Sequence, residues 1–327
     1  MLTKRDLLKA SAALCALSLG LGRAGLAAAA DMIEQLQIFV PAAPGGGWDQ
    51  TARTMEQVLK AEKLIGSAQI TNVGGAGGAV GLPQFINQWR GRENALMVGG
   101  LVMVGALIAN KSPVKITQTV PIARLTGEFE VLVVPANSPL KTAKDFAALL
   151  KSDPKKASVA GGSAGGTDHI LLGMIGKALG VPAKDLSYVA YAGGGPALAA
   201  ILGGHVAAGI SGFGEFGEQI KAGKLRALAI SSGERQPGID VPTLKEQGID
   251  VELANWRGVF APPGISNAQR DKLIKLVETM ANSASWKDQL KKRDWTPILL
   301  TGDAYAKYIE QENERISAVL KDLGLAS

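Results

Sequence analysis

The chain has 327 residues with a formal net charge of +6, and only 5% of them are aromatic. This small positive excess, without a basic stripe or many aromatic residues, does not indicate a nucleic-acid-binding protein. Glycine is the informative residue type, because the 41 glycines far exceed the usual share of about 7%. They gather at the ends of apolar segments, and a collagen-like period is absent from the sequence.

The first 30 residues predict a secretory signal peptide. The chain opens with basic residues such as Lys4 and Arg5, continues with an apolar stretch from 7 to 21, and reaches small residues before Asp31. This is the order of a cleavable export signal, and the apolar stretch is shorter than the ~20 residues of a membrane span. The segment around Arg5 is similar to a twin-arginine signal in which Lys replaces the first Arg. We therefore expect 1–30 to be removed on export to the periplasm.

The only cysteine, Cys15, lies inside this segment. The exported chain would therefore contain no cysteine, which excludes disulfides, thiolate catalysis and cysteine-based metal sites from it. Two histidines in the whole chain make a zinc site improbable as well. We expect no metal and no cofactor.

From position 31 onward, short apolar segments alternate with amphipathic helical segments. This alternation predicts an α/β fold, with mostly parallel sheets that are flanked by helices. The segment is long enough for more than one lobe. The predicted strands are 36–40, 68–73, 95–98, 131–134, 157–160, 186–191, 206–210 and 225–230, and residues from 267 to the end are predicted to be almost wholly helical.

Glycine clusters follow several predicted strands, at 45–47, 74–78, 161–166 and 193–195. In parallel sheets a ligand binds beyond the carboxyl ends of the strands. The helices that start there present free N–H groups and a positive dipole end, and both favour an anion. We expect Asp49 to cap the helix after the first cluster and to turn its carboxylate away from such a ligand. The pattern thus indicates an anion-binding cleft.

One segment resembles an enzyme motif. Gly161-Gly162-Ser163-Ala164-Gly165 fits the G-x-S-x-G nucleophile elbow between a strand and a helix. A serine hydrolase also needs an acid and a histidine, and His169 and His205 are the only histidines. His169 lies six residues after Ser163, on the helix that the elbow would open, where it cannot easily turn back. A secreted serine hydrolase is therefore the alternative function, and a glycine-rich turn explains the same residues.

Two tryptophans and two arginines could either contact a ligand or have a purely structural role. Trp48 and Trp256 could line a ligand cleft or pack in the core, which is the more common place for an aromatic ring. Arg53 and Arg124 could bind a carboxylate through two parallel hydrogen bonds, although long basic side chains are mostly solvated.

Five glycine-containing blocks, taken together, resemble the substrate-binding receptors of tripartite tricarboxylate transporters, the Bug-type receptors. The first runs from Val40 through Gly45-Gly46-Gly47-Trp48-Asp49, and the likeness covers essentially the whole exported chain. Each block alone is weak, but five blocks in the family's order are specific. The blocks are 40–49, 72–78, 161–167, 191–198 with 203–204, and 227–229 with 241–244.

The resemblance implies a two-lobed, Venus-flytrap fold of the periplasmic-binding-protein type. Lobe one would comprise 31–127 plus 260–327 and lobe two 128–259, with hinges near 128–131 and 257–260. The ligand would lie between the lobes, held mainly by backbone amides and water. The implied ligand-binding residues are Gly46, Gly47, Trp48, Asp49, Ser163, Ala164, Gly165, Thr167, Tyr191, Gly193 and Gly194.

The resemblance also implies a function without catalysis. The chain would be a monomeric periplasmic receptor for a small organic carboxylate, which it delivers to the membrane permease of a tripartite tricarboxylate transporter. Two positions depart from the family pattern: Trp48 replaces a small hydroxyl residue, and Ala207 replaces an acidic one. Loss of an acid near the pocket would disfavour an amino acid, so a di- or tricarboxylate, citrate-like, is expected.

Overall fold

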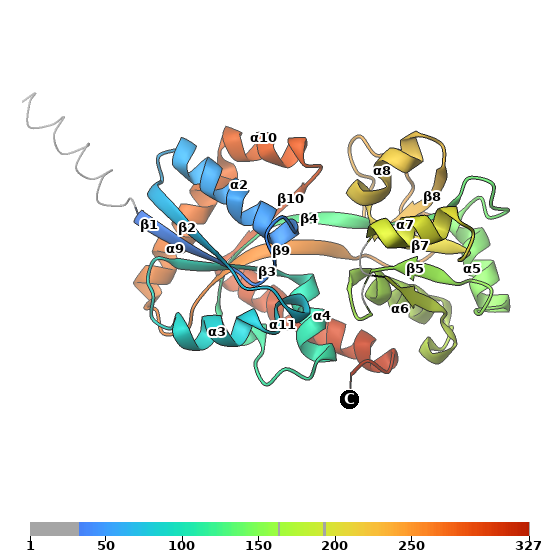
Figure 1. The fold of residues 1–327 in the computed structure, drawn as a ribbon, viewed down its shortest axis with the longest axis horizontal. Coiled ribbons are helices and arrows are strands. Elements are labelled where there is room, and N and C mark those ends of the chain that lie inside the picture. The colour runs from blue at the N-terminus through green and yellow to red at the C-terminus, as the bar shows by residue number, and fades with distance from the viewer. Residues whose placement is uncertain (1–32, 163, 192–193, 327) are drawn as a thin grey trace, which may run out of the picture.

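A computed structural model describes residues 33–162, 164–191 and 194–326 of the chain, which form two α/β lobes side by side (Figure 1). The predicted signal peptide and Cys15 lie outside the described residues, as do Ser163 and Gly193. The strands pair in the order β2-β1-β3-β9-β4-β7-β5-β6, and both β10 and β8 pair with β4. The α/β class and the two-lobed architecture predicted from the sequence are confirmed.

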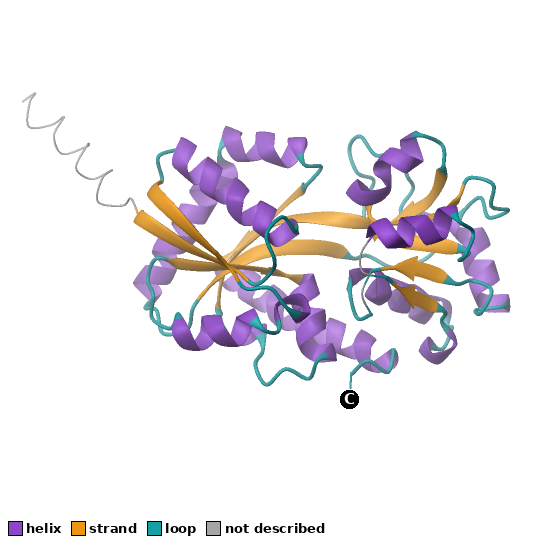
Figure 2. Cartoon of the chain, in the orientation of Figure 1, coloured by secondary structure: helices purple, strands orange, loops and turns teal. Residues whose placement is uncertain are grey.

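Lobe one is built on β1, whose apolar residues Leu36, Ile38 and Val40 are fully buried between parallel neighbours β2 and β3. Helices cover both faces of its sheet (Figure 2). Helix α9 starts where the Ser266 hydroxyl accepts from the backbone N–H of Gln269, a capping box. The elements are β1 (Ile33–Val40), β2 (Ile65–Asn72), β3 (Ala95–Gly100), β9 (Ala254–Ala261), β10 (Thr296–Thr301), α2 (Gly47–Ala61), α3 (Gly81–Gln88), α4 (Leu101–Ala109), α9 (Asn267–Asn282), α10 (Ala284–Lys292), and the 3-10 turns η1 (Ala76–Gly78) and η2 (Ile116–Gln118).

Lobe two has a second sheet, in which β5 pairs in parallel with β6 and β7 while β4 pairs antiparallel with β7 and β8. Its apolar core lies between this sheet and helices on both sides, and it includes Val131, Val133 and Phe216. The elements are β5 (Val159–Gly161), β6 (Tyr188–Ala190), β7 (Ala208–Gly212), β8 (Leu225–Ile230), α5 (Ala143–Ser152), α6 (Thr167–Leu179), α7 (Gly194–Leu202), α8 (Phe213–Lys221), and the 3-10 turns η3 (Ala183–Asp185) and η4 (Lys245–Gln247).

One strand, β4 (Val120–Pro135), belongs to both lobes. Phe129 still pairs with Ala254 of β9 in the first sheet, whereas Glu130 pairs with Gly212 of β7 in the second. The chain returns through the segment before β9, where Leu253 donates its N–H to the carbonyl of Ser231 at 2.9 Å. The division into 31–127 plus 260–327 and 128–259 stays a prediction.

Helix α11 (Gly302–Asp322) is a third connection between the lobes. It packs on β4 and α4 and reaches α6 of lobe two. There Gly173 leaves space for Leu323, since a Cβ on Gly173 would lie 2.8 Å from the Leu323 Cδ1. Lys177 and Asp322 form an ion pair at 2.8 Å beside this contact.

Three features of the fold differ from the sequence predictions. The pairing is mixed rather than mostly parallel, because every antiparallel pair among the described residues includes β4 or β9. Strands β9 and β10 and the first half of β4 were not predicted. The region after 267 is interrupted by β10, where Thr296, Pro297, Leu300 and Thr301 pair with β4. β4 carries the chain from lobe one to lobe two, and β9 brings it back beside β4 in the opposite direction. The two strands therefore pair antiparallel.

Candidate functional site

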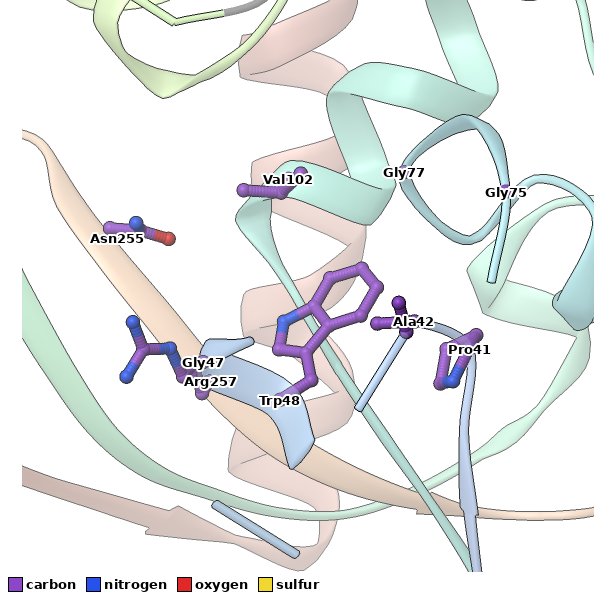
Figure 3. Close-up of a pocket in the computed structure, with 10 residues that line it drawn as sticks. Pro41, Ala42, Gly47, Trp48, Gly75, Gly77, Val102, Asn255 and Arg257 are labelled. Atoms are coloured by element: carbon purple, nitrogen blue, oxygen red, sulfur yellow. The ribbon is translucent and has the colours of Figure 1, made fainter. Parts of the chain in front are cut away.

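A pocket of about 330 Å³ opens on lobe one beside the crossing between the lobes. It is bordered by the loop before α2, the turn η1, the start of α4 and one face of β9 (Figure 3). Three of its lining residues are glycines, which have no side chain to fill the pocket, and an arginine and an asparagine supply polar groups. Its lining residues are Pro41, Ala42, Ala43, Gly47, Trp48, Gly75, Gly77, Val102, Asn255 and Arg257.

Arg257 is the cationic group of this pocket. Asn255 and Arg257 are two residues apart on β9, so both side chains project from the same face of the strand. The Arg257 guanidinium forms an ion pair with Glu128 of β4 and lies 5.4 Å from the centre of the Trp295 ring. It is 9% exposed, so its position is fixed by packing as well as by charge.

The first predicted loop lies at the start of α2, with Gly46 as the N-cap and Gly47 as the first helical residue. Asp49 therefore does not cap the helix, which corrects the sequence interpretation. Its buried carboxylate instead accepts from the N–H of Gly45 at 2.8 Å, from Arg53 Nε at 2.8 Å and from Asn72 Nδ2 at 3.0 Å. Burial alone would raise the pKa of Asp49, but these hydrogen bonds lower it below the usual value. The carboxylate thus holds the glycine loop, and Asp49 is not among the residues that line the pocket.

Trp48 combines both of its possible roles. Its ring is 8% exposed and belongs to the apolar core of lobe one, yet one side lines the pocket. A Cβ on Gly78 would lie 3.2 Å from the Trp48 ring, so the second glycine loop packs closely on it. Trp256, by contrast, is fully buried and donates from Nε1 to Glu312 at 3.0 Å, and it is a core residue.

The arginines singled out in the sequence do not reach the pocket. The Arg53 side chain is 55% exposed and pairs with Asp49. Arg124 stacks on the Tyr308 ring, 4.3 Å from its centre, and donates to the Ile298 carbonyl at 2.9 Å. Neither residue lines the pocket.

The lobe-two loop, defined here as 161–166, is held by side chains that follow it. Asp168 accepts from the N–H of Gly162 at 2.5 Å, and the Tyr188 hydroxyl donates to the carbonyl of the same glycine at 2.8 Å. The N–H of Gly165 donates to His169 Nδ1 at 3.2 Å. Burial lowers the pKa of His169 to about 4, so its ring is neutral near pH 7. This imidazole also stacks on Tyr188, with ring centres 4.1 Å apart.

The lobe-two candidates do not line the described pocket, whereas Gly47 and Trp48 do. Ala164 is exposed, and Gly165 is buried against α4, where its added Cβ would lie 3.3 Å from Ala109. Thr167 is buried, and no protein group bonds its hydroxyl among the described residues. The remaining candidates are Gly46, which is exposed, Tyr191, whose N–H donates to Gly161 at 2.9 Å, and Gly194, which begins α7.

Ala207 lies at the wrong end of its strand for a role in the pocket. Its N–H donates to the Ser158 carbonyl at 3.1 Å, before the first residue of β5. Because β5 and β7 are parallel, this is the amino end of both strands, and the lobe-two loop follows the carboxyl end of β5. Ala207 therefore gives no reason to disfavour an amino acid as the ligand.

Sequence reasoning did not identify Arg257 and Asn255 as pocket residues. The segment ANWRGVFA of β9 contains one β-branched residue and was not recognised as a strand. The available signal was the spacing of two polar residues, two positions apart, in an otherwise apolar segment, which places both on one face of a strand.

The two-lobed α/β fold, with a pocket beside the crossing strands, defines a solute-binding protein of the periplasmic type. Residues 51–325 match the family model described as the tripartite tricarboxylate transporter family receptor. The chain belongs to this family of periplasmic receptors. Among the described residues, no helix has the length and apolar character to span a membrane. Within the same ranges, no group of His, Asp and Glu side chains is arranged to hold a metal ion.

Similar proteins cover nearly the same length. A Cupriavidus necator protein described as "UPF0065 protein in gbd 5'region" is 28% identical over 326 residues, 97% of both chains. Protein BugT of Bordetella pertussis is 28% identical over 298 residues, 88% of this chain and 89% of BugT.

Solved structures share the fold. A TctC solute-binding protein from Polaromonas superimposes with a TM-score of 0.75 at 24% identity, over 89% of this chain and 99% of that one. MatC from Rhodopseudomonas palustris, solved with bound malate, gives 0.68 at 25% identity, over 88% and 99%.

Proposed function

We propose that this chain is a periplasmic receptor that binds a small organic carboxylate between its lobes and delivers it to the permease of a tripartite tricarboxylate transporter. The ligand is a di- or tricarboxylate, with citrate-like anions favoured. The protein is exported by its N-terminal signal, acts as a monomer, catalyses no reaction and requires no cofactor.

The position of Arg257 carries this proposal. Its guanidinium lies in the pocket against Gly47, the first residue of α2. A guanidinium offers parallel N–H donors that match a carboxylate, and the start of a helix adds free N–H groups and partial positive charge. Arg257 is buried and the start of α2 packs against it, so an anion meets donors that are already in place.

The relatives agree with a carboxylate ligand. MatC, which is 25% identical to this chain, holds malate in its solved structure. A small dicarboxylate of that kind carries one carboxylate for Arg257 and leaves another for the amides of the lobe-two loop. The family description names a transporter of tricarboxylates, which supports the permease as the partner.

The lobe-two geometry favours a receptor over a serine hydrolase. His169 accepts a hydrogen bond from the Gly165 backbone through Nδ1, and Asp168 accepts one from Gly162. In a triad, Nδ1 carries the proton and donates it to the acid. Here both groups instead hold the backbone of the loop. This supports binding through the loop and gives the histidine no role as a base.

The test is isothermal titration of the exported chain against citrate, malate, succinate, glutamate and glucose. We expect at least one di- or tricarboxylate to bind, and Arg257→Gln to weaken it at least tenfold, about 1.4 kcal/mol. The matched control is Arg124→Gln, which should bind like the parent because Arg124 stacks on Tyr308 away from the pocket.

Two further measurements complete the test. Small-angle scattering should show a smaller radius of gyration with bound ligand, because receptors of this shape close about a hinge. Ester substrates should not be turned over. Binding of glucose alone, or ester hydrolysis that Ser163→Ala abolishes, would contradict the proposal.

A further inference from the structure

Glu130 is a buried acid at the point where β4 passes from one sheet to the other. It is the first β4 residue to pair with β7, opposite Gly212. Its side chain is 1% exposed, and its Oε2 atom has no donor among the described residues. An ionised carboxylate in this position would lack both water and a counter-charge.

The charged groups around Glu130 are mostly acids. They come from each neighbouring element: Asp168 from α6, Glu215 from α8 and Glu128 from β4 itself. Arg257 forms an ion pair with one of these acids, Glu128. The other titratable groups facing this region are His169 and Tyr188, which are stacked on each other. Burial, followed by the charges of Asp168 and Glu128, raises the pKa of Glu130 well above its usual value.

Asp168 links Glu130 to the lobe-two loop. The two carboxyl groups lie within hydrogen-bonding contact of each other. Asp168 also accepts the N–H of Gly162, whose carbonyl is held by Tyr188. A Cβ on Gly161 would lie 2.7 Å from the Asp168 Cβ, so the loop is packed closely against this residue. The backbone that precedes Ser163 is thus fixed by the acid that Glu130 contacts.

We propose that Glu130 is a positioning residue for the lobe-two loop: it keeps its proton and donates it to Asp168, and Asp168 remains the carboxylate that accepts from Gly162. Two ionised carboxylates are both acceptors and cannot hydrogen-bond to each other, whereas a neutral carboxyl supplies the donor that this contact requires. The consequence for ligand binding rests on the proposed function, whereas the bound proton does not.

Retention of this proton makes folding stability depend on pH. The folded chain keeps the Glu130 proton at a pH where the unfolded chain has lost it, so the folded state binds more protons above the usual glutamate pKa. Stability from this group is therefore fully present at low pH and falls as the pH rises toward the raised pKa. Glutamine cannot lose a proton but can donate to Asp168 in the same way.

A ligand-free experiment tests the proton. Thermal melts of the parent, Glu130→Gln and the control Glu218→Gln are compared from pH 6.5 to pH 8.5. Burial raises the pKa of Asp168 to about 6, so Asp168 is mostly ionised over this range. We expect the melting temperature of Glu130→Gln to rise relative to the parent by about 2 °C per pH unit, the value for one proton in a chain of this size. Glu218 is exposed and paired with Lys221, so its variant should run parallel to the parent. Parallel curves for both variants would overturn the proposal.

Binding tests the positioning role. With citrate as the probe at pH 7, Glu130→Gln should bind within threefold of the parent, because the amide still donates to Asp168. Glu130→Leu, checked for folding by circular dichroism, should bind at least tenfold more weakly. Equal binding by the leucine variant would overturn the role in positioning. If the parent binds no carboxylate, the proposed function fails, while the melts still decide whether Glu130 holds its proton.

Discussion

The guanidinium of Arg257 lies directly against the backbone of Gly47. A Cβ added to Gly47 would lie 2.8 Å from Nη2 and 2.9 Å from Cζ. The cation of the pocket and the first residue of α2 are therefore one packed unit, although 210 positions separate them in the sequence. Any side chain at Gly47 must displace Arg257 or the helix start.

Gly47→Ala should therefore weaken carboxylate binding by about tenfold, because the methyl group pushes the guanidinium out of its position. The matched control is Gly46→Ala: its added Cβ would meet only the Ala43 carbonyl, at 3.8 Å, and its φ of −74° suits any residue. Isothermal titration with citrate compares the two. Equal affinities would show that Arg257 is not part of the binding site.

Glu128→Gln should strengthen carboxylate binding. The parent Glu128 neutralises Arg257 through their ion pair, and its negative charge lies near the pocket. Removing that charge should favour an anion by about 1 kcal/mol, roughly fivefold in affinity. The gain should shrink in 1 M salt, because screening weakens the charge that was removed. A loss of affinity would mean instead that Glu128 is needed to orient Arg257.

Asp49→Asn should lower stability by about 1–3 kcal/mol, since one donor that now reaches the carboxylate would be left unpaired. Hydrogen bonds lower the pKa of Asp49 despite burial, so its contribution is present above the usual aspartate pKa and is lost as the pH falls below it. The melting-temperature deficit of the variant should therefore shrink toward pH 3. Asp185→Asn is the control: Asp185 is an exposed carboxylate, and its variant should change the melting temperature little. A deficit that is constant with pH would argue against this role.

His169→Asn should change the pH dependence of stability in a defined direction. Burial lowers the pKa of His169 to about 4, so the folded chain resists a proton that the unfolded chain accepts below about 6.5. Its contribution is present above that pH and is lost as the pH falls toward 4. Asparagine keeps an acceptor for the Gly165 N–H without titrating. The melting temperature of the variant, relative to the parent, should rise between pH 7 and pH 5.

The control for this experiment is His205→Asn, since His205 is exposed. Its curve should stay parallel to that of the parent. If His169→Asn is also parallel, the imidazole takes up its proton as readily in the folded chain as in the unfolded chain, and its Nδ1 atom is not held as an acceptor for Gly165.

Local sequence pattern was sufficient where an apolar run ends in glycine. The strand before Gly45 and the one before Gly161 were placed within a few residues, because buried strands are apolar and glycine marks the turn that follows. Gly47 was assigned to the site through the family resemblance, and it lines the pocket.

The pattern failed where pairing across the chain decides the structure. β9 and β10 are strands because β4 lies beside them, and each contains a residue that strands disfavour, Gly258 in β9 and Pro297 in β10. Arg257 reaches the pocket only through β9, so its role depended on an unrecognised strand. Asp49 was assigned as a cap from its local context, but its partner Asn72 lies at the end of another strand.

A strand that belongs to two sheets has a mechanical consequence. β4 carries backbone hydrogen bonds to neighbours along its whole length on both sides of Glu130, so the lobes cannot swivel about a single bond. Closure of the lobes must instead bend and twist β4 together with the strands that are hydrogen-bonded to it, and these hydrogen bonds resist the deformation. Part of the free energy of ligand binding would then be stored in the bent backbone. The same stored strain would lower the net affinity for the ligand and would favour reopening of the lobes once the ligand contacts are lost.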